Sequence, residues 1–241
     1  EGTFLEGVPD FSQYAENDVV HLSDVSGDPT VLVDNTTYPL EIEELEDGDV
    51  SIKLSKFETK PTQVTDDELY ALAYDKMGLV KTRHGNRLSE TMLDKAIHAF
   101  APTEDTAETP VLLTTGTMDE DGRKKLTRLD VIALRRKLDK LKVPKKGRRL
   151  VLCSDHVADL LEIDQKFQNQ YHDYSTGVIM KMYGFEIYEA VNCPLFDCTT
   201  KKKKSFGSVA TVNDFEGSVF FYVPRMFKCK GGTKMYYSKA E

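Results

Sequence analysis

Apolar residues recur close to the helical period over a long stretch that runs from Thr65 to Phe100. Thr65 and Glu68 have the spacing of a capping box, and Pro102 follows the stretch as a stop signal. The pattern therefore predicts a helix over residues 65–100, which at ~1.5 Å per residue would be about 54 Å long. Its apolar positions are Leu69, Leu72, Ala73, Met77, Val80, Leu88, Met92, Ala96 and Ala99.

Two glycines lie inside this predicted helix and weaken the pattern. Gly78 and Gly85 each cost about 1 kcal/mol relative to alanine in a helix interior. We therefore expect a bend or a break near them, and the alternative is two ordinary helices separated at Gly85. In either arrangement this segment is the scaffold on which the other elements rest.

A period of two residues precedes the helix and predicts a β-hairpin within residues 38–60. Asp47-Gly48 is the turn signal between its two strands. An isolated hairpin is marginal in water, so its apolar face needs cover from the same chain or from a neighbouring subunit. We expect residues 38–60 to project from the body of the subunit or to be poorly ordered when the subunit is unassembled. The apolar positions of its strands are Leu40, Ile42, Leu45, Val50, Ile52 and Leu54.

The remaining patterns are shorter and mix strands with helices. Residues 1–18 show no period and indicate an extended arm, and the lysine run Lys201–Lys204 indicates a solvated loop tip. Strands are predicted at 19–22, 30–33, 111–115, 148–153, 177–191 with a kink at Gly184, 209–212, 218–223 and 235–237. Helices are predicted at 129–141, capped by Thr127 and Asp130, and at 155–161, capped by Ser154. An order without regular βαβ alternation favours the α+β class.

Composition narrows the class of protein. With 241 residues, 40% of them hydrophobic, the chain has room for one large domain or two small ones. It shows no apolar run of about 18 residues and no signal peptide, so we expect no membrane partner. Its four cysteines form no C-x-x-C and no common zinc pattern, and we expect reduced thiols, no metal and no cofactor. A disulfide or a shared metal between Cys193 and Cys198 is the alternative.

Charge is distributed unevenly along the chain, whose net charge is -8. Residues 1–68 hold 18 acids and 3 bases, a net of 3 - 18 = -15. Residues 123–149 hold 13 bases and 2 acids, a net of 13 - 2 = +11. The basic block is either a solvated face or a nucleic-acid-binding surface that neutralises phosphates, although it lacks interleaved aromatic residues.

An enzymatic reading rests on Cys153, Asp155 and His156, because cysteine and histidine can form a nucleophile pair. Cys153 ends an apolar strand, so we expect a buried, unreactive thiol instead. The chain carries none of the common hydrolase, nucleotide-binding or metalloprotease motifs. We therefore predict no catalytic residues and no enzyme.

Two stretches carry a resemblance to a known family. Residues 143–161, V-P-K-K-G-R-R-L-V-L-C-S-D-H-V-A-D-L-L, have a basic turn, a strand and a helix start. Residues 177–194, G-V-I-M-K-M-Y-G-F-E-I-Y-E-A-V-N-C-P, form a strand pair that ends at a proline. Together with the order of the elements, they resemble the major capsid protein of tailed bacteriophages and prophages, which has the Hong Kong 97-type fold.

The resemblance implies a domain plan and a function. It implies an N-terminal arm at 1–30, an extended β-hairpin loop at 31–64, a peripheral domain with a spine helix at 65–127, an axial domain at 128–204, and return strands of the peripheral domain at 205–241. The implied function is structural: self-assembly, as pentamers and hexamers, into an icosahedral virion shell made in the bacterial host cytoplasm. The implied partners are other copies of the chain, scaffold or portal proteins, and packaged DNA held by non-specific contact.

Opposite charges on the extended loop and the basic block suggest how neighbouring subunits would pair. In a ring of identical subunits, each acidic loop would meet the basic block next door, a head-to-tail contact that closes. The expected acidic residues are Glu41, Glu43, Glu44, Glu46 and Asp47. The expected basic residues are Arg135, Arg136, Lys140, Lys145, Lys146, Arg148 and Arg149.

Overall fold

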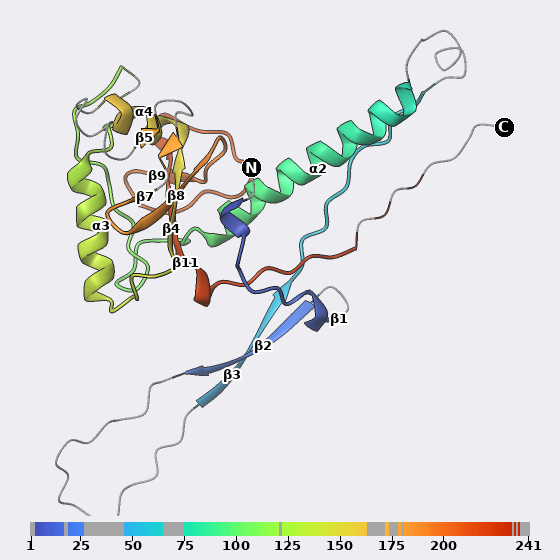
Figure 1. The fold of residues 1–241 in the computed structure, drawn as a ribbon, viewed down its shortest axis with the longest axis horizontal. Coiled ribbons are helices and arrows are strands. Elements are labelled where there is room, and N and C mark those ends of the chain that lie inside the picture. The colour runs from blue at the N-terminus through green and yellow to red at the C-terminus, as the bar shows by residue number, and fades with distance from the viewer. Residues whose placement is uncertain are drawn as a thin grey trace, which may run out of the picture. The chain divides into compact units, whose positions relative to one another are not determined.

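The computed structural model divides the chain into two units (Figure 1). Glu1–Val8 and Phe57–Met226 form the larger unit, and Pro9–Lys56 and Phe227–Glu241 form the smaller one. Helices and strands are mixed in the larger unit, as the α+β prediction requires. The residues that the structure describes are 3–16, 19–26, 46–64, 75–120, 122–162, 172–173, 178–179, 181–232, 234 and 236.

A four-stranded mixed sheet lies at the centre of the larger unit, in the order β11-β4-β8-β7. β4 and β8 are parallel, and β11 and β7 are antiparallel to their neighbours. The predicted kink at Gly184 is a tight turn between β7 and β8, with positive φ angles of 49° at Tyr183 and 86° at Gly184. The strands are β4 (Arg148–Cys153), β7 (Lys181–Met182), β8 (Phe185–Ala190) and β11 (Val219–Tyr222).

β4 is buried on both faces, as its uninterrupted apolar run predicts. Leu150 and Leu152 point into one hydrophobic cluster, and Val151 points into another. All three side chains are at most 4% exposed. The strand therefore joins two separate packing layers, one on each side of the sheet.

Two helices cover the first face of the sheet, and both were predicted. α3 (Arg128–Lys140) begins at Thr127, whose side chain forms a reciprocal capping box with Asp130. α4 (Ser154–Glu162) follows β4 directly. The buried members of this cluster are Val131, Leu138, Leu150, Leu152, Val157, Leu160, Met182, Phe185 and Ile187.

The second face packs against α2 (Lys76–Phe100) and the N-terminal segment, which includes the 3-10 turn η1 (Thr3–Leu5). Phe4 contacts Phe221 of β11 edge-on, with ring centroids 6.5 Å apart. The predicted arm therefore begins by packing against its own subunit. The buried members of this cluster are Phe4, Val8, Ile97, Ala101, Val151, Val219 and Phe221.

α2 differs from the predicted single helix over 65–100. It begins at Lys76 because Asp75 is a non-helical N-cap, whose carboxylate accepts the Gly78 N–H at 2.9 Å. A Cβ at Gly78 would lie 2.3 Å from Asp75 Oδ2, so this glycine leaves room for the cap. The predicted break at Gly85 is also wrong, because the helix runs through it without interruption. The rest of the expected helix, 65–74, lies outside the described residues.

Shorter elements complete the larger unit. Of the remaining predicted strands, 218–223 is confirmed as β11, whereas 111–115 and 209–212 contain no strand. Val209 and Val212 are 88% and 92% exposed, so their apolar pattern reflects no burial. Two antiparallel pairs are β5 (His172–Asp173) with β6 (Val178–Ile179), and β9 (Leu195–Asp197) with β10 (Asp214–Glu216); η3 (Val223–Arg225) follows β11.

The smaller unit contains η2 (Ser12–Tyr14) and a three-stranded antiparallel sheet in the order β1-β2-β3. These strands are β1 (Ala15–Glu16), β2 (Val19–Ser26) and β3 (Glu46–Lys53). The predicted turn at Asp47-Gly48 is wrong, because both residues lie inside β3 and pair with Val25 and Asp24 of β2. The eight paired positions of this ladder outweigh a local turn preference. The predicted partner strand at 38–45 and the predicted strand at 30–33 lie outside the described residues.

Candidate functional site

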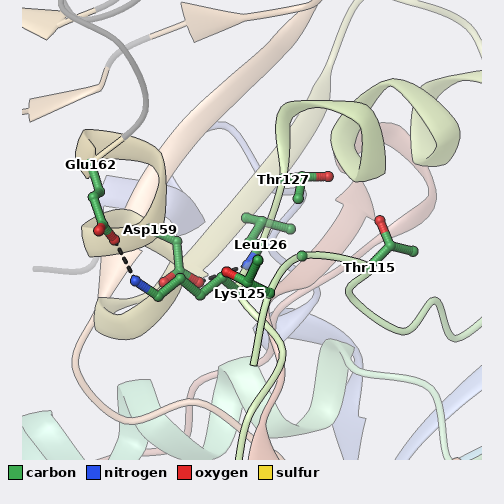
Figure 2. Close-up of a pocket in the computed structure, with 8 residues that line it drawn as sticks. Thr115, Lys125, Leu126, Thr127, Asp159 and Glu162 are labelled. Atoms are coloured by element: carbon green, nitrogen blue, oxygen red, sulfur yellow. Dashed lines mark hydrogen bonds and ion pairs between the residues drawn. The ribbon is translucent and has the colours of Figure 1, made fainter. Parts of the chain in front are cut away.

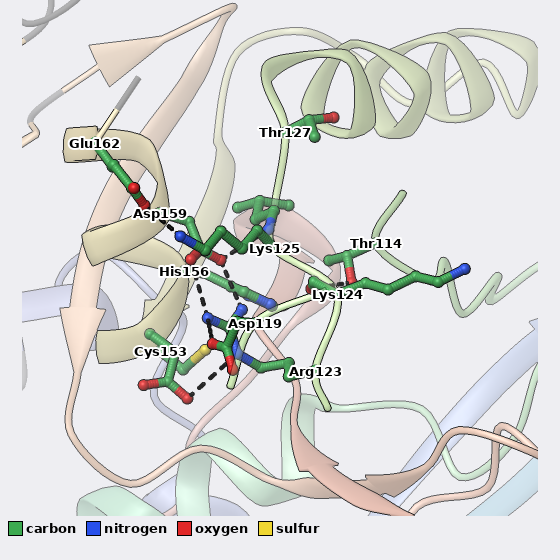
Figure 3. A network of polar contacts seen from close by, with 12 residues as sticks. Thr114, Asp119, Arg123, Lys124, Lys125, Thr127, Cys153, His156, Asp159 and Glu162 are labelled. Carbon is green, nitrogen blue, oxygen red and sulfur yellow. Dashed lines mark hydrogen bonds and ion pairs between the residues drawn. The ribbon is translucent and has the colours of Figure 1, made fainter. Parts of the chain in front are cut away.

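A buried ion network holds the loop before α3 against α4 (Figure 3). Both amino groups of Arg123 donate to Asp159, at 2.6 and 2.9 Å. Asp119 lies 3.1 Å from the same guanidinium, and Asp155 lies 3.8 Å away. The side chains of Arg123 and Asp159 are 11% and 4% exposed, so the pair is almost fully removed from water.

The network fixes the charge states of Arg123 and Asp159. Burial by itself raises the pKa of Asp159, but hydrogen bonds from Arg123 and from the Leu126 N–H, at 2.7 Å, outweigh it and lower the pKa below 3.8. The hydrogen bond to Asp159 is also the main reason that the pKa of Arg123 is raised. Both groups are therefore ionised over the whole physiological range.

An open pocket of about 590 Å³ lies beside this network (Figure 2). Lys125 reaches across it to Glu162, with 2.6 Å between Nζ and Oε2. Asp159 accepts bonds from Leu126 and Arg123, so its carboxylate is already occupied. The polar groups around the pocket bind one another, which indicates a structural clamp between the loop and α4.

The basic block of residues 123–149 is partly consumed inside the subunit. Arg148 is 2% exposed and donates to Asp139 at 2.7 Å and to two backbone carbonyls, those of Pro144 and Val143. With Arg123 engaged as well, the block offers fewer charges to a partner than the sequence count suggests.

Arg149 fastens the N-terminal segment to the sheet. Its guanidinium donates to the carbonyls of Phe4, at 2.8 Å, and of Glu6. It also pairs with Glu186 at 3.0 Å and lies over the ring of Tyr188, 5.4 Å from its centroid. A charged residue at the start of a strand that is buried on both faces needs partners of this kind. An arginine placed directly before the apolar run is therefore the sign in the sequence that such partners exist.

Other basic residues predicted for the subunit interface remain near the surface. Arg136, Lys140, Lys145 and Lys146 are exposed. Arg135 is partly exposed, and its Nε lies 3.9 Å from Asp139. Of the predicted acidic residues, Glu46 and Asp47 belong to strand β3. Glu41, Glu43 and Glu44 lie outside the described residues, so the predicted pairing stays a prediction.

Cys153 is confirmed as a buried thiol on a strand, with 0% exposure. Burial raises its pKa, which disfavours the nucleophilic thiolate. Burial also lowers the pKa of His156, so the neutral imidazole is favoured, and its Nδ1 lies 2.6 Å from Ser218 Oγ. The Cys153 N–H donates to the same oxygen at 3.1 Å, so Ser218 ties β4, α4 and β11 together.

The lysine run Lys201–Lys204 was predicted to be a solvated tip, and this is wrong. Lys203 Nζ donates to the carbonyls of His98 and Ala101 at the C-terminal end of α2, at 2.8 and 2.6 Å. The three remaining lysines pair with Asp105, Glu104 and Asp214, in chain order. A charge run gives no sign in the sequence of which carbonyls and carboxylates it will meet.

Two features are absent from the part of the chain that the structure describes. Its His, Cys, Asp and Glu residues form no group of three or more that could hold a metal ion. Among its helices, none has the length and apolar character that crossing a membrane requires.

Comparisons with known proteins find relatives by structure only. No family model matches the sequence, and no curated protein matches it. The chain is similar to a structure of Mycobacterium phage Che8, with a TM-score of 0.58 and 17% identity over 78% of this chain and 68% of that one. It is similar to the capsid structure of the cyanophage P-SCSP1u, with a TM-score of 0.58 and 14% identity over 91% of this chain and 72% of that one.

A third structure extends the similarity to a mature shell. The chain is similar to the asymmetric unit of the bacteriophage PhiM1 mature capsid, with a TM-score of 0.62 and 12% identity over 91% of this chain and 71% of that one. The resemblance to phage capsid proteins is thus confirmed at the level of the fold.

Proposed function

We propose that this protein is a major capsid protein of a tailed phage or prophage, which self-assembles into a virion shell that encloses DNA. The observation that carries the proposal is the fold similarity to the PhiM1 mature capsid over 91% of this chain. The proposal is an inference from fold similarity, and because one fold can serve several functions, assembly itself has to be tested.

The proposal assigns roles to the observed elements. α2 serves as the spine helix, and the β2–β3 pair serves as the base of the extended loop. The β11-β4-β8-β7 sheet with α3 and α4 serves as the body of the axial domain. Two of the domain limits given for the sequence change under this proposal. β2 (Val19–Ser26) moves from the arm, 1–30, to the extended loop, 31–64, and β11 (Val219–Tyr222) moves from the return strands, 205–241, to the axial domain, 128–204. The limits of the peripheral domain, 65–127, are kept.

Assembly is the property to test. We expect concentrated protein to form closed shells or rings of pentamers and hexamers, visible by negative-stain electron microscopy and as fast-sedimenting species in analytical ultracentrifugation. A protein that stays monomeric across salt, pH and concentration, with or without a co-expressed scaffold protein, contradicts the proposal.

Charge pairing between neighbours is the proposed source of register. Arg148 and Arg149 are bound within the subunit, which leaves Arg135, Arg136, Lys140, Lys145 and Lys146 as the basic side. Each exposed pair contributes roughly 0–1 kcal/mol, but several repeated around a ring set orientation and association rate.

A charge-reversal series tests this pairing. Changing Glu43, Glu44 and Glu46 to Lys is expected to slow assembly at low salt, as measured by light scattering. Adding Arg135→Glu and Arg136→Glu is expected to restore part of the rate. Unchanged assembly in both variants contradicts charge pairing while leaving the shell function intact.

A further inference from the structure

We propose that the groove between α2 and the segment that runs beside it, residues 57–60, binds the phosphate backbone of double-stranded DNA. The proposal rests on the proposed function, because a shell that encloses DNA presents this polyanion to its inner surface. It assigns the contact to residues outside the basic block of 123–149.

Two walls form this groove. Residues 57–64 run along α2, and Thr62 Oγ1 lies 2.9 Å from Nε2 of His84 on the helix. The groove has a volume of about 450 Å³. It is lined by Phe57, Glu58, Thr59, Lys60, Arg83, His84, Arg87, Leu88 and Thr91.

The bases of the groove come from both walls. Lys60 stands on one wall, and Arg83 and Arg87 stand one helical turn apart on the other, so both arginines face the same side of α2. From Lys76 to Ser89 the helix carries four bases and no acid, in a chain whose net charge is -8. The first half of α2 is therefore a local positive strip on an acidic protein.

The exposed arginines of this strip remain accessible to a ligand. Arg87 pairs with Glu90 at 3.3 Å, but the two side chains are 74% and 53% exposed, so water screens the pair. Arg123, by contrast, faces Asp159 with 11% exposure. Burial thus separates structural bases from those that a polyanion can reach.

The groove chemistry favours phosphate. Arginine presents a planar fork that matches phosphate oxygens, and lysine adds a mobile point charge from the facing wall. Glu58 is the acid among the lining residues, and it leaves the lining with more positive than negative groups. Because the bases follow one helix face, the groove suits a ligand with evenly repeated charges, contacted without reading its bases.

The test is a salt titration of binding to a labelled 20-base-pair duplex, measured by fluorescence anisotropy with the full chain. Each phosphate contact contributes about 0.9 to the slope of log affinity against log salt. Arg83→Gln with Arg87→Gln is expected to lower this slope by about 1.8 and to weaken binding roughly 60-fold at 0.1 M salt. Lys60→Gln, on the other wall, is expected to lower the slope by about 0.9.

A matched control removes the same charge from α3. Arg136→Gln with Lys140→Gln leaves the groove intact, so we expect the slope to stay within about 0.3 of the unchanged protein, a third of one contact. An unchanged slope in the groove variants, or an equal loss in the α3 control, overturns the proposal. The melting temperature of each variant is measured as well, so that loss of binding can be told from loss of folding. Lys60→Gln tests the groove without changing the sequence of α2.

Competition separates DNA from an acidic peptide. Unlabelled duplex is expected to displace the labelled duplex, and polyglutamate of equal charge is expected to compete at least tenfold less well. Equal or better competition by polyglutamate overturns the assignment to DNA. Shell formation is measured separately by negative-stain microscopy. If the protein forms shells but the groove variants leave the salt slope unchanged, only the DNA-binding groove is overturned. If the protein forms no shells, the proposed function is overturned.

Discussion

Replacing Arg123 by Met is the sharpest test of the network in Figure 3. The substitution removes both hydrogen bonds to Asp159 and keeps an unbranched side chain of similar length. Asp159 would then be left 4% exposed, with the Leu126 N–H as its remaining bond among those described. A buried carboxylate in that state is strongly destabilising.

The expected loss follows from general values for buried pairs. Removing one partner of a buried ion pair costs about 3–5 kcal/mol, because the other charge stays buried. For a domain of this size, each kcal/mol shifts the melting temperature by roughly 2–4 °C, so a decrease of about 6–20 °C is expected. Arg123→Lys keeps the positive charge but loses the paired donors of the guanidinium, so its melting temperature should lie between those of the unchanged protein and Arg123→Met.

Differential scanning calorimetry at pH 7 measures this loss, with Arg87→Met as the control. Arg87 and Glu90 form an exposed pair at 3.3 Å, for which a loss of about 0–1 kcal/mol is expected. The lowered pKa of Asp159 adds a pH signature. The ionised Asp159 stabilises the fold above the pKa of the unfolded chain, and this contribution is lost as the pH falls through the lower pKa of the folded protein. Arg123→Met should therefore make the melting temperature depend less steeply on pH below 3.8. If Arg123→Met and Arg87→Met cost the same, the buried pair does not stabilise this fold.

Two further predictions concern single contacts. Lys203→Met should lower the free energy of unfolding by about 1–3 kcal/mol, measured by calorimetry, because the carbonyls of His98 and Ala101 lose their donor. Burial lowers the pKa of Lys203, which reduces but does not remove this contribution. Lys202→Met, at an exposed position, is the control and should cost about 0–1 kcal/mol. Equal losses contradict the capping role. His156 has a pKa lowered by burial, so the unfolded chain takes up its proton first and stability should fall as pH drops below 6.5. His156→Asn should weaken this dependence in melts at pH 7.5 and 5.5. His98, whose pKa burial also lowers, should retain part of it, and an unchanged slope contradicts the prediction.

The elements predicted best are those for which local and global preferences agree. β4 is an uninterrupted apolar run because it is buried on both faces, and the capping box at Thr127 and Asp130 predicts the start of α3. The apolar run of β4 is itself buried, and Val131 and Leu138, which follow the cap of α3 at helical spacing, are buried as well. The sequence therefore carries enough information to place them.

The errors arise where a specific contact outweighs the ordinary preference of a residue. Asp47-Gly48 has turn chemistry, yet the backbone of β2 holds it in a ladder. Gly78 reads as a helix breaker, yet its missing side chain makes room for the Asp75 cap. The first partner is another strand, and the second is a side chain only three residues away. The pattern of hydrophobic positions predicts neither contact, because both are made by polar or backbone atoms.

Charged residues were the least predictable part of the candidate site. Thirteen bases between 123 and 149 look equivalent in the sequence, but Arg123 and Arg148 are buried against carboxylates, whereas Arg136 and Lys140 are exposed. Which of these outcomes a base meets depends on neighbours that a charge count does not show: Asp159 lies 36 residues from Arg123, and Asp139 lies 9 residues from Arg148. Counting charge therefore locates a basic segment but does not identify a binding surface.

The chain path would give the N-terminal segment a mechanical role in the proposed shell. The chain leaves the larger unit after Val8 and returns to it at Phe57. On the outgoing side, Phe4 and Val8 are each 4% exposed in the core, and Arg149 binds the carbonyl of Phe4 at 2.8 Å. On the returning side, residues 57–64 lie along α2, where Thr62 contacts His84 at 2.9 Å. Both ends of the intervening chain are thus held by the larger unit, so in the proposed shell a load on this chain would pass into the sheet and α2.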